Sequence, residues 1–162
     1  MATIEISAKD VFKLRKQTGA GMMDCKKALI EAEGDFEKAT DVLRKTGQKL
    51  ANKRADREAT EGYVLGFNNN EAASIIVLNC ETDFVAKNDD FASLVKRFAE
   101  VAVDSKSTSL EELKAQSIDG ITLDEKVVEQ TGVIGEKLDL YYFETVSGGK
   151  VTTYNHPGNR IA

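Results

Sequence analysis

The sequence has few of the residues that mark metal, redox or membrane proteins. It contains no Trp and one Pro, and its two cysteines, Cys25 and Cys80, lie far apart with no CxxC pair. We therefore expect neither a metal site nor a disulfide, and we interpret both thiols as reduced and buried. The longest apolar runs, such as residues 75–78, have only the length of a strand, so no membrane partner or span is expected.

Catalytic motifs are equally scarce. The chain has one histidine, His156, and it lacks the nucleophile-elbow, zinc-protease and phosphate-loop patterns. The glycines Gly19 and Gly21 do not follow a strand-like run, so direct nucleotide binding is not expected. An enzyme that brings Cys25 or Cys80 to His156 in space is the weakest of the functional alternatives. We expect no cofactor and no covalent chemistry.

Charge is divided unevenly along the chain. Residues 1–58 carry 13 basic and 10 acidic side chains, and the remaining residues carry 9 and 17, which together give the net charge of -5. Such a split is typical of two modules with different partners, and its basic part is too weak for a nucleic-acid footprint. The first residues, MATIE, lack the basic-then-apolar pattern of a signal peptide, so we expect a cytoplasmic protein.

Capping signals predict three short helices before residue 48. Ser7 followed by Asp10 forms a capping box, and Asp24 and Asp35 are the N-cap candidates of the second and third helices. Gly47 is placed to close the third helix. The charged and alanine-rich stretch that follows, residues 49–60, indicates a helical or flexible basic linker.

The remaining residues predict an antiparallel sheet packed with long helices. Two apolar runs separated by three asparagines predict a hairpin over residues 62–78. Helical spacing over residues 91–102 predicts a long amphipathic helix capped by Asp89 or Asp90. A second hairpin is predicted over residues 138–154, around a Ser-Gly-Gly turn. The expected fold class is α+β, with a three-helix module over 1–48, a linker over 49–60 and an α+β core over 61–162.

Two longer segments are more specific than these patterns. Residues 18–29 (TGAGMMDCKKAL) and 79–87 (NCETDFVAK) resemble signature stretches of translation elongation factor Ts. Residues 134–137 (IGEK) and 154–161 (YNHPGNRI) support the match, which spans essentially the whole chain. The order of elements is also similar to that family, in which a module resembling ubiquitin-associated domains precedes a basic linker and a sheet with long helices.

The resemblance implies a guanine-nucleotide exchange factor that makes elongation factor Tu release GDP by disturbing its Mg²⁺ and phosphate site. In the family, one segment pushes against the GTPase near its magnesium site, with a phenylalanine ring as a wedge. The matching residues of this chain are Thr82, Asp83, Phe84 and Val85. The resemblance assigns further contacts with elongation factor Tu to Lys26, Ile134, Gly135 and His156.

Two departures accompany the resemblance. Family members generally continue beyond the position where this sequence stops, so we expect it to be part of a longer protein. Asn159 stands where many members have Gly.

Both the function and the placement of Phe84 have alternatives. The chain could be a ubiquitin-like or nascent-chain binding module, for which residues 82–87 have no use, and Phe84 could pack inward against Phe91.

Overall fold

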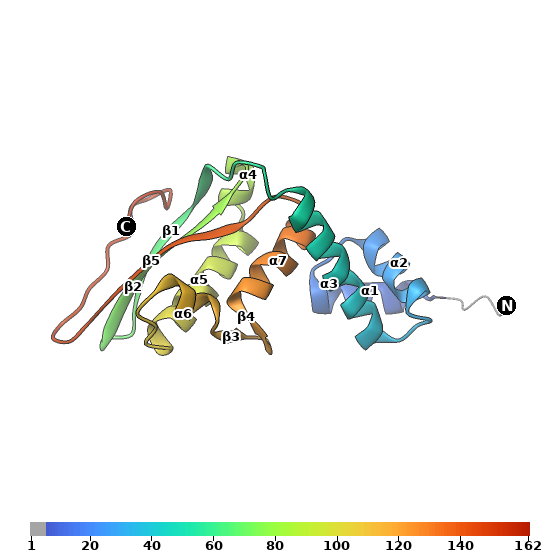
Figure 1. Cartoon of the computed structure of the whole chain (residues 1–162), viewed down its shortest axis with the longest axis horizontal. Coiled ribbons are helices and arrows are strands. Elements are labelled where there is room, and N and C mark those ends of the chain that lie inside the picture. Colours follow the sequence, from blue (N-terminus) through green and yellow to red (C-terminus); the bar gives the residue numbers. More distant parts are fainter. Residues whose placement is uncertain (1–5) are drawn as a thin grey trace. The chain divides into compact units, whose positions relative to one another are not determined.

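The structure is a computed structural model that describes residues 6–162, and it divides into two compact units (Figure 1). Unit 1 contains the described residues up to Ala55 together with Val128–Gly135, and unit 2 contains Asp56–Val127 and Glu136–Ala162. Helices and an antiparallel sheet confirm the predicted α+β class. The boundaries that we expect between module, linker and core, at residues 48 and 60, stay a prediction.

Three helices open unit 1: α1 (Ala8–Thr18), α2 (Met22–Glu31) and α3 (Phe36–Lys53). The predicted caps of α1 and α3 are confirmed. The hydroxyl oxygen of Ser7 accepts a hydrogen bond from the Asp10 N–H at 3.1 Å, and the Asp35 carboxylate accepts from two N–H groups at the start of α3. These bonds satisfy donors that a helix leaves unpaired at its first turn. The helices enclose a small core that includes Leu14, Cys25 and Leu29.

Two predicted helix boundaries in unit 1 are wrong. The helix α2 begins at Met22 with Gly21 as its N-cap, so Asp24 lies inside the first turn and does not cap it. Gly47 does not close α3, which continues to Lys53. Gly47 lies instead in a close helix contact within α3: a Cβ atom added to Gly132, in the part of α7 (Leu123–Ile134) that belongs to unit 1, would lie 2.5 Å from the Gly47 Cα.

Unit 2 is built on a three-stranded antiparallel sheet in the order β1-β2-β5. The predicted first hairpin is confirmed as β1 (Glu61–Asn68) and β2 (Ala72–Cys80), and β5 (Asp139–Ser147) pairs with the other edge of β2. The helix α5 (Asp89–Asp104) packs against β1 and β2 (Figure 1). It buries one side of its surface, including Phe91, Val95 and Phe98. This stripe is the one that the helical spacing predicted.

The N-cap of α5 differs from the prediction. Asn88 caps the helix, and its side-chain oxygen accepts from the N–H groups of Asp90 and Phe91. Asp89 and Asp90 are the first residues of the helix, where their charge still complements the helix dipole. An Asn and an Asp serve equally well as N-caps, so a run of such residues leaves the helix start open by one position.

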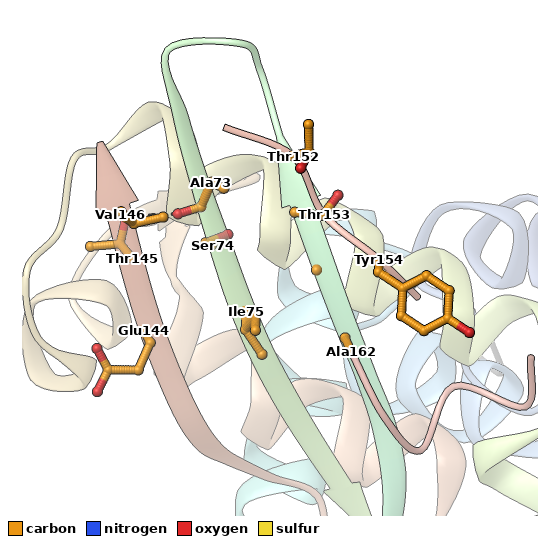
Figure 2. Close-up of a pocket in the computed structure, with 11 residues that line it drawn as sticks. Ala73, Ser74, Ile75, Glu144, Thr145, Val146, Thr152, Thr153, Tyr154 and Ala162 are labelled. Atoms are coloured by element: carbon orange, nitrogen blue, oxygen red, sulfur yellow. Dashed lines mark hydrogen bonds between the residues drawn. The ribbon is translucent and has the colours of Figure 1, made fainter. Parts of the chain in front are cut away.

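The second predicted hairpin is also wrong. The strand β5 forms, but residues 150–154 form no strand. After the glycine turn the chain crosses to the opposite edge of the sheet and runs along β1, where Figure 2 shows Thr152, Thr153 and Tyr154. The Asn155 side chain bonds both backbone groups of Gly66, at 2.7 and 2.9 Å. A side-chain amide therefore supplies the pairing that a fourth strand would have given.

Shorter elements complete unit 2. They are α4 (Asp83–Ala86), α6 (Leu110–Lys114), the two-stranded ladder of β3 (Ser117–Ile118) and β4 (Ile121–Thr122), and the first residues of α7. Ser109 caps α6, and its side-chain oxygen accepts from the Glu112 N–H at 3.2 Å. Across residues 6–162, none of the helices combines the length and the apolar character that a membrane crossing requires.

Candidate functional site

The predicted wedge segment forms a short turn at one end of the sheet in unit 2. Strand β2 ends at Cys80, and α4 begins three residues later, with Thr82 as its N-cap. The second residue of α4 is Phe84, whose exposed fraction is 84%, whereas Phe91 is 2% exposed. The alternative in which Phe84 packs inward is therefore wrong. Ala86 is the buried residue of this helix, so α4 rests on Ala86 and presents Phe84 to solvent.

A second segment holds this turn by its backbone. The N–H groups of Glu81 and Thr82 donate to Glu136 Oε2 at 3.1 and 3.0 Å, and the Thr82 hydroxyl donates to Glu136 Oε1 at 2.6 Å. In return, the Lys137 N–H donates to Glu81 Oε1 at 2.6 Å. We call this reciprocal arrangement of Glu81, Thr82, Glu136 and Lys137 the glutamate clamp. It joins residues more than fifty positions apart.

Asp83 lies among positive charges. Lys87 donates a hydrogen bond to its carboxylate at 2.6 Å, and this bond holds the pKa of Asp83 below its ordinary value, with a further contribution from the charge of Arg160. Arg160 also pairs with Glu61, which lies directly opposite Cys80 in the sheet register. The α4 turn and the turn that carries Arg160 are thus anchored at the same end of the sheet.

The lowered pKa of Asp83 gives a testable consequence. Replacing Lys87 with Ala should raise this pKa toward its ordinary value of 3.8. Because the folded pKa is depressed, the ion pair stabilises the fold above about pH 4 and the stabilisation disappears as the pH falls through the folded pKa. Titration of the Asp83 carboxyl by NMR in both proteins measures the shift. An identical pKa in the variant would contradict the assignment to Lys87.

His156 lies in an exposed turn, just after the segment that runs alongside β1. Its ring Nδ1 is 2.9 Å from the Tyr154 hydroxyl oxygen. Its backbone N–H donates to the Ile161 carbonyl, and its backbone carbonyl accepts from the Asn159 N–H. Asn159 has a φ of 52°, in the left-handed region that Asn tolerates better than most residues. The turn therefore keeps a geometry suited to Gly. The Asn159 carbonyl also accepts from Val64 in β1.

The other expected contact residues belong to unit 1. Lys26 is exposed on α2. Ile134 is the last residue of α7, and Gly135 follows it with a φ of 82°, which favours glycine. The structure thus groups the wedge residues and His156 within unit 2, and Lys26, Ile134 and Gly135 within unit 1. Their roles in binding a partner stay predictions.

Sequence reasoning missed the residues that support the site. Glu81 and Glu136 lie inside segments that carry the resemblance, but no pattern in the sequence indicates that they meet. Lys87 could have been paired with Asp83, because residues four apart lie on the same side of a helix. Arg160 and Glu61 are separated by 99 positions, and only the fold brings them together.

Both thiols are buried and held in the protonated form. Burial, followed by the negative charge of Glu136, raises the pKa of Cys80 to about 11, and burial raises that of Cys25. Cys80 donates to the Thr82 carbonyl at 3.2 Å. A buried, protonated thiol is a poor nucleophile. Within residues 6–162, no three His, Cys, Asp or Glu side chains gather in a way that could hold a metal ion.

The raised pKa predicts slow alkylation of the folded protein. At pH 8.5 an ordinary thiol is about half ionised, whereas a pKa of about 11 leaves roughly one thiol in a hundred or fewer ionised. We expect iodoacetamide to modify Cys80 about a hundredfold more slowly in the native protein than in the urea-unfolded protein, as measured by peptide mass spectrometry. Equal rates in both states would contradict this placement of Cys80.

Comparison with known proteins adds a family to this geometry. The family model described as Elongation factor TS matches residues 81–162. Elongation factor Ts of Christiangramia forsetii is 54% identical over 160 residues, which cover 98% of this chain and 58% of that protein. Elongation factor Ts of Flavobacterium johnsoniae is 54% identical over 159 residues, covering 97% and 49%, and that of Rhodopirellula baltica is 49% identical over 156 residues, covering 96% and 48%. The chain spans about half the length of the curated relatives it matches.

Proposed function

Because the chain belongs to the elongation factor Ts family, we propose that it promotes GDP release from elongation factor Tu in the cytoplasm during translation elongation. The observation that carries this proposal is the exposed phenylalanine on α4, which is 84% exposed on a helix whose start is fixed by the glutamate clamp. A large apolar side chain that is held outward exposes apolar surface to water in the unbound protein, which is unfavourable. Such a side chain is typical of an interface anchor.

The proposed action is mechanical and electrostatic and needs no covalent chemistry and no cofactor in this chain. A GTPase holds GDP through its phosphate loop and a Mg²⁺ ion, which demands near-ideal octahedral coordination. Insertion of Phe84 beside the magnesium site of the GTPase displaces the ligands of the Mg²⁺ ion by small distances and so weakens the binding of GDP. By linkage, the factor by which the exchange factor lowers the affinity of the GTPase for GDP is also the factor by which GDP lowers its affinity for the exchange factor.

The other residues of the proposed interface serve recognition. Thr82, Asp83 and Val85 accompany the wedge on the same turn, and His156 offers a polar ring on an exposed turn of unit 2. Lys26, Ile134 and Gly135 offer contacts from unit 1, where an exposed amine on α2 suits an acidic surface. Elongation factor Tu is the proposed partner of all these residues.

A second candidate is a peptide-binding module in unit 1 without exchange activity. The helices α1 and α2 leave several large apolar side chains exposed, among them Phe12 at 63%, Met23 at 63% and Ile30 at 55%. Such side chains suit a ubiquitin-like or nascent-chain partner. This candidate gives no role to the held, exposed Phe84 of unit 2, which is why we favour exchange.

The deciding experiment is release of a fluorescent GDP analogue from elongation factor Tu. The GTPase is loaded with the analogue, chased with excess unlabelled GDP, and mixed with substoichiometric amounts of this 162-residue chain. We expect faster release that rises with the concentration of the chain, with several GTPase molecules discharged per chain. Unchanged release would refute the exchange function, and binding without release would favour the module hypothesis.

A further inference from the structure

The start of α4 requires support from outside the helix. The helix has four residues, Asp83–Ala86. A single turn pays the full cost of nucleation and gains few internal hydrogen bonds, so it does not hold its own geometry. The direction in which Phe84 projects therefore depends on the packing of Ala86 against unit 2 and on the backbone just before the helix, at Glu81 and Thr82.

Glu136 provides that support. Its two carboxylate oxygens accept from three donors, the N–H groups of Glu81 and Thr82 and the Thr82 hydroxyl, at 3.1, 3.0 and 2.6 Å. Hydrogen bonds to an ionised carboxylate are about twice as strong as neutral ones. Two successive backbone N–H groups that point at one oxygen allow little rotation of the peptide between them.

Two further bonds fix the same residues from other sides. The Lys137 N–H donates to the Glu81 carboxylate at 2.6 Å, so the two segments bind each other reciprocally. The Cys80 thiol donates to the Thr82 carbonyl at 3.2 Å. Loss of Glu136 thus removes three bonds to this turn and leaves the bonds from Lys137 and Cys80 in place.

We propose that Glu136 is a positioning residue for nucleotide exchange, which acts through Thr82 to hold Phe84 in the orientation that the GTPase meets. The inference rests on the proposed exchange function. It assigns Glu136 no contact with the nucleotide or the magnesium ion. Its effect falls on the step that follows encounter, because a turn that must be ordered in the complex lowers the fraction of productive complexes.

The chain offers a matched control at Glu112. One oxygen of Glu112 accepts from the Thr108 N–H at 2.8 Å and from the Thr108 hydroxyl at 2.9 Å, so the type of bond is the same. These bonds support α6, which contains none of the proposed contact residues. Glu112→Ala therefore measures the general cost of losing a carboxylate that caps backbone donors.

The test compares Glu136→Ala, Glu136→Gln and Glu112→Ala in three measurements: maximal GDP release from elongation factor Tu, the concentration that gives half of it, and amide hydrogen exchange. We expect Glu136→Ala to lower maximal release about tenfold with a smaller change in half-saturation, and to speed exchange at the Glu81 and Thr82 amides. Glu136→Gln retains one carbonyl acceptor and should recover part of the loss. Glu112→Ala should leave GDP release unchanged.

The outcomes separate the two proposals. If the wild-type chain does not release GDP, the exchange function fails and this inference fails with it. If the wild type is active and Glu136→Ala matches Glu112→Ala in GDP release, only the positioning role is overturned. Should thermal melting show that Glu136→Ala is unfolded, Glu136→Gln decides: full activity with rapid exchange at the Thr82 amide would overturn the role, and reduced activity in a folded protein supports it.

Discussion

Replacing Phe84 with Ala is expected to slow GDP release from elongation factor Tu about thirtyfold while leaving the free energy of unfolding within about 0.5 kcal/mol of wild type. The side chain is 84% exposed, so its removal leaves no cavity in the core. An aromatic anchor that becomes buried in an interface contributes about 2 kcal/mol, which corresponds to the stated change in rate. GDP release and thermal melting, measured on the same preparation, test both halves of this prediction.

Two control variants make this result specific. Tyr141 is another exposed aromatic residue of unit 2, at 63%, and lies outside the proposed interface, so Tyr141→Ala should leave GDP release unchanged. Phe98 is fully buried, and Phe98→Ala should cost about 3 to 5 kcal/mol of stability. Release at the wild-type rate by a folded Phe84→Ala protein would remove the wedge from the mechanism.

Local chemistry made much of the fold predictable from the sequence. Ser7, Asp35 and Ser109 cap helices because each places an oxygen within reach of N–H groups two or three residues later. The apolar stripe of α5 and the first hairpin follow equally from spacing, since the sheet has to bury one face. These features depend on neighbours along the chain.

The wrong predictions concern features whose structure depends on contacts with segments far away in the sequence. Residues 151–154 are β-branched or aromatic, which is typical of a strand, but the fold carries them to the free edge of β1, where Asn155 makes the bonds. Nothing near residue 150 specifies which edge of the sheet the chain will follow. Gly47 was interpreted as a helix end because glycine favours that position, whereas its partner Gly132 is 85 positions away.

The candidate site divides in the same way. The resemblance assigns the wedge to Phe84 and its neighbours, but it gives no reason for the outward direction of the ring. That reason lies in the bonds from Glu81 and Thr82 to Glu136, which span 55 and 54 positions. A sequence identifies the residue that acts on a partner more readily than the residues that hold it in place.

The close contact between Gly47 and Gly132 leads to a second prediction, which concerns the stability of unit 1. A Cβ on Gly132 would lie 2.5 Å from the Gly47 Cα, a backbone atom that cannot rotate away. Helix propensity alone predicts that Gly132→Ala stabilises the protein by about 1 kcal/mol. Overpacking against backbone costs about 1 to 3 kcal/mol, occasionally more, and at this separation we expect a net loss of about 2 kcal/mol in unit 1.

Gly47→Ala is the matched control, since it places the new methyl group on the opposite side of the same contact. Its Cβ would meet the Val128 carbonyl oxygen at 3.4 Å and the Gly132 Cα at 3.5 Å, which are ordinary van der Waals separations. This variant should therefore be neutral or slightly more stable than wild type, because the propensity gain is not opposed. Urea unfolding of both variants measures the difference. If Gly132→Ala were as stable as Gly47→Ala, the two helices could separate at no cost, and the close approach would not restrict position 132 to glycine.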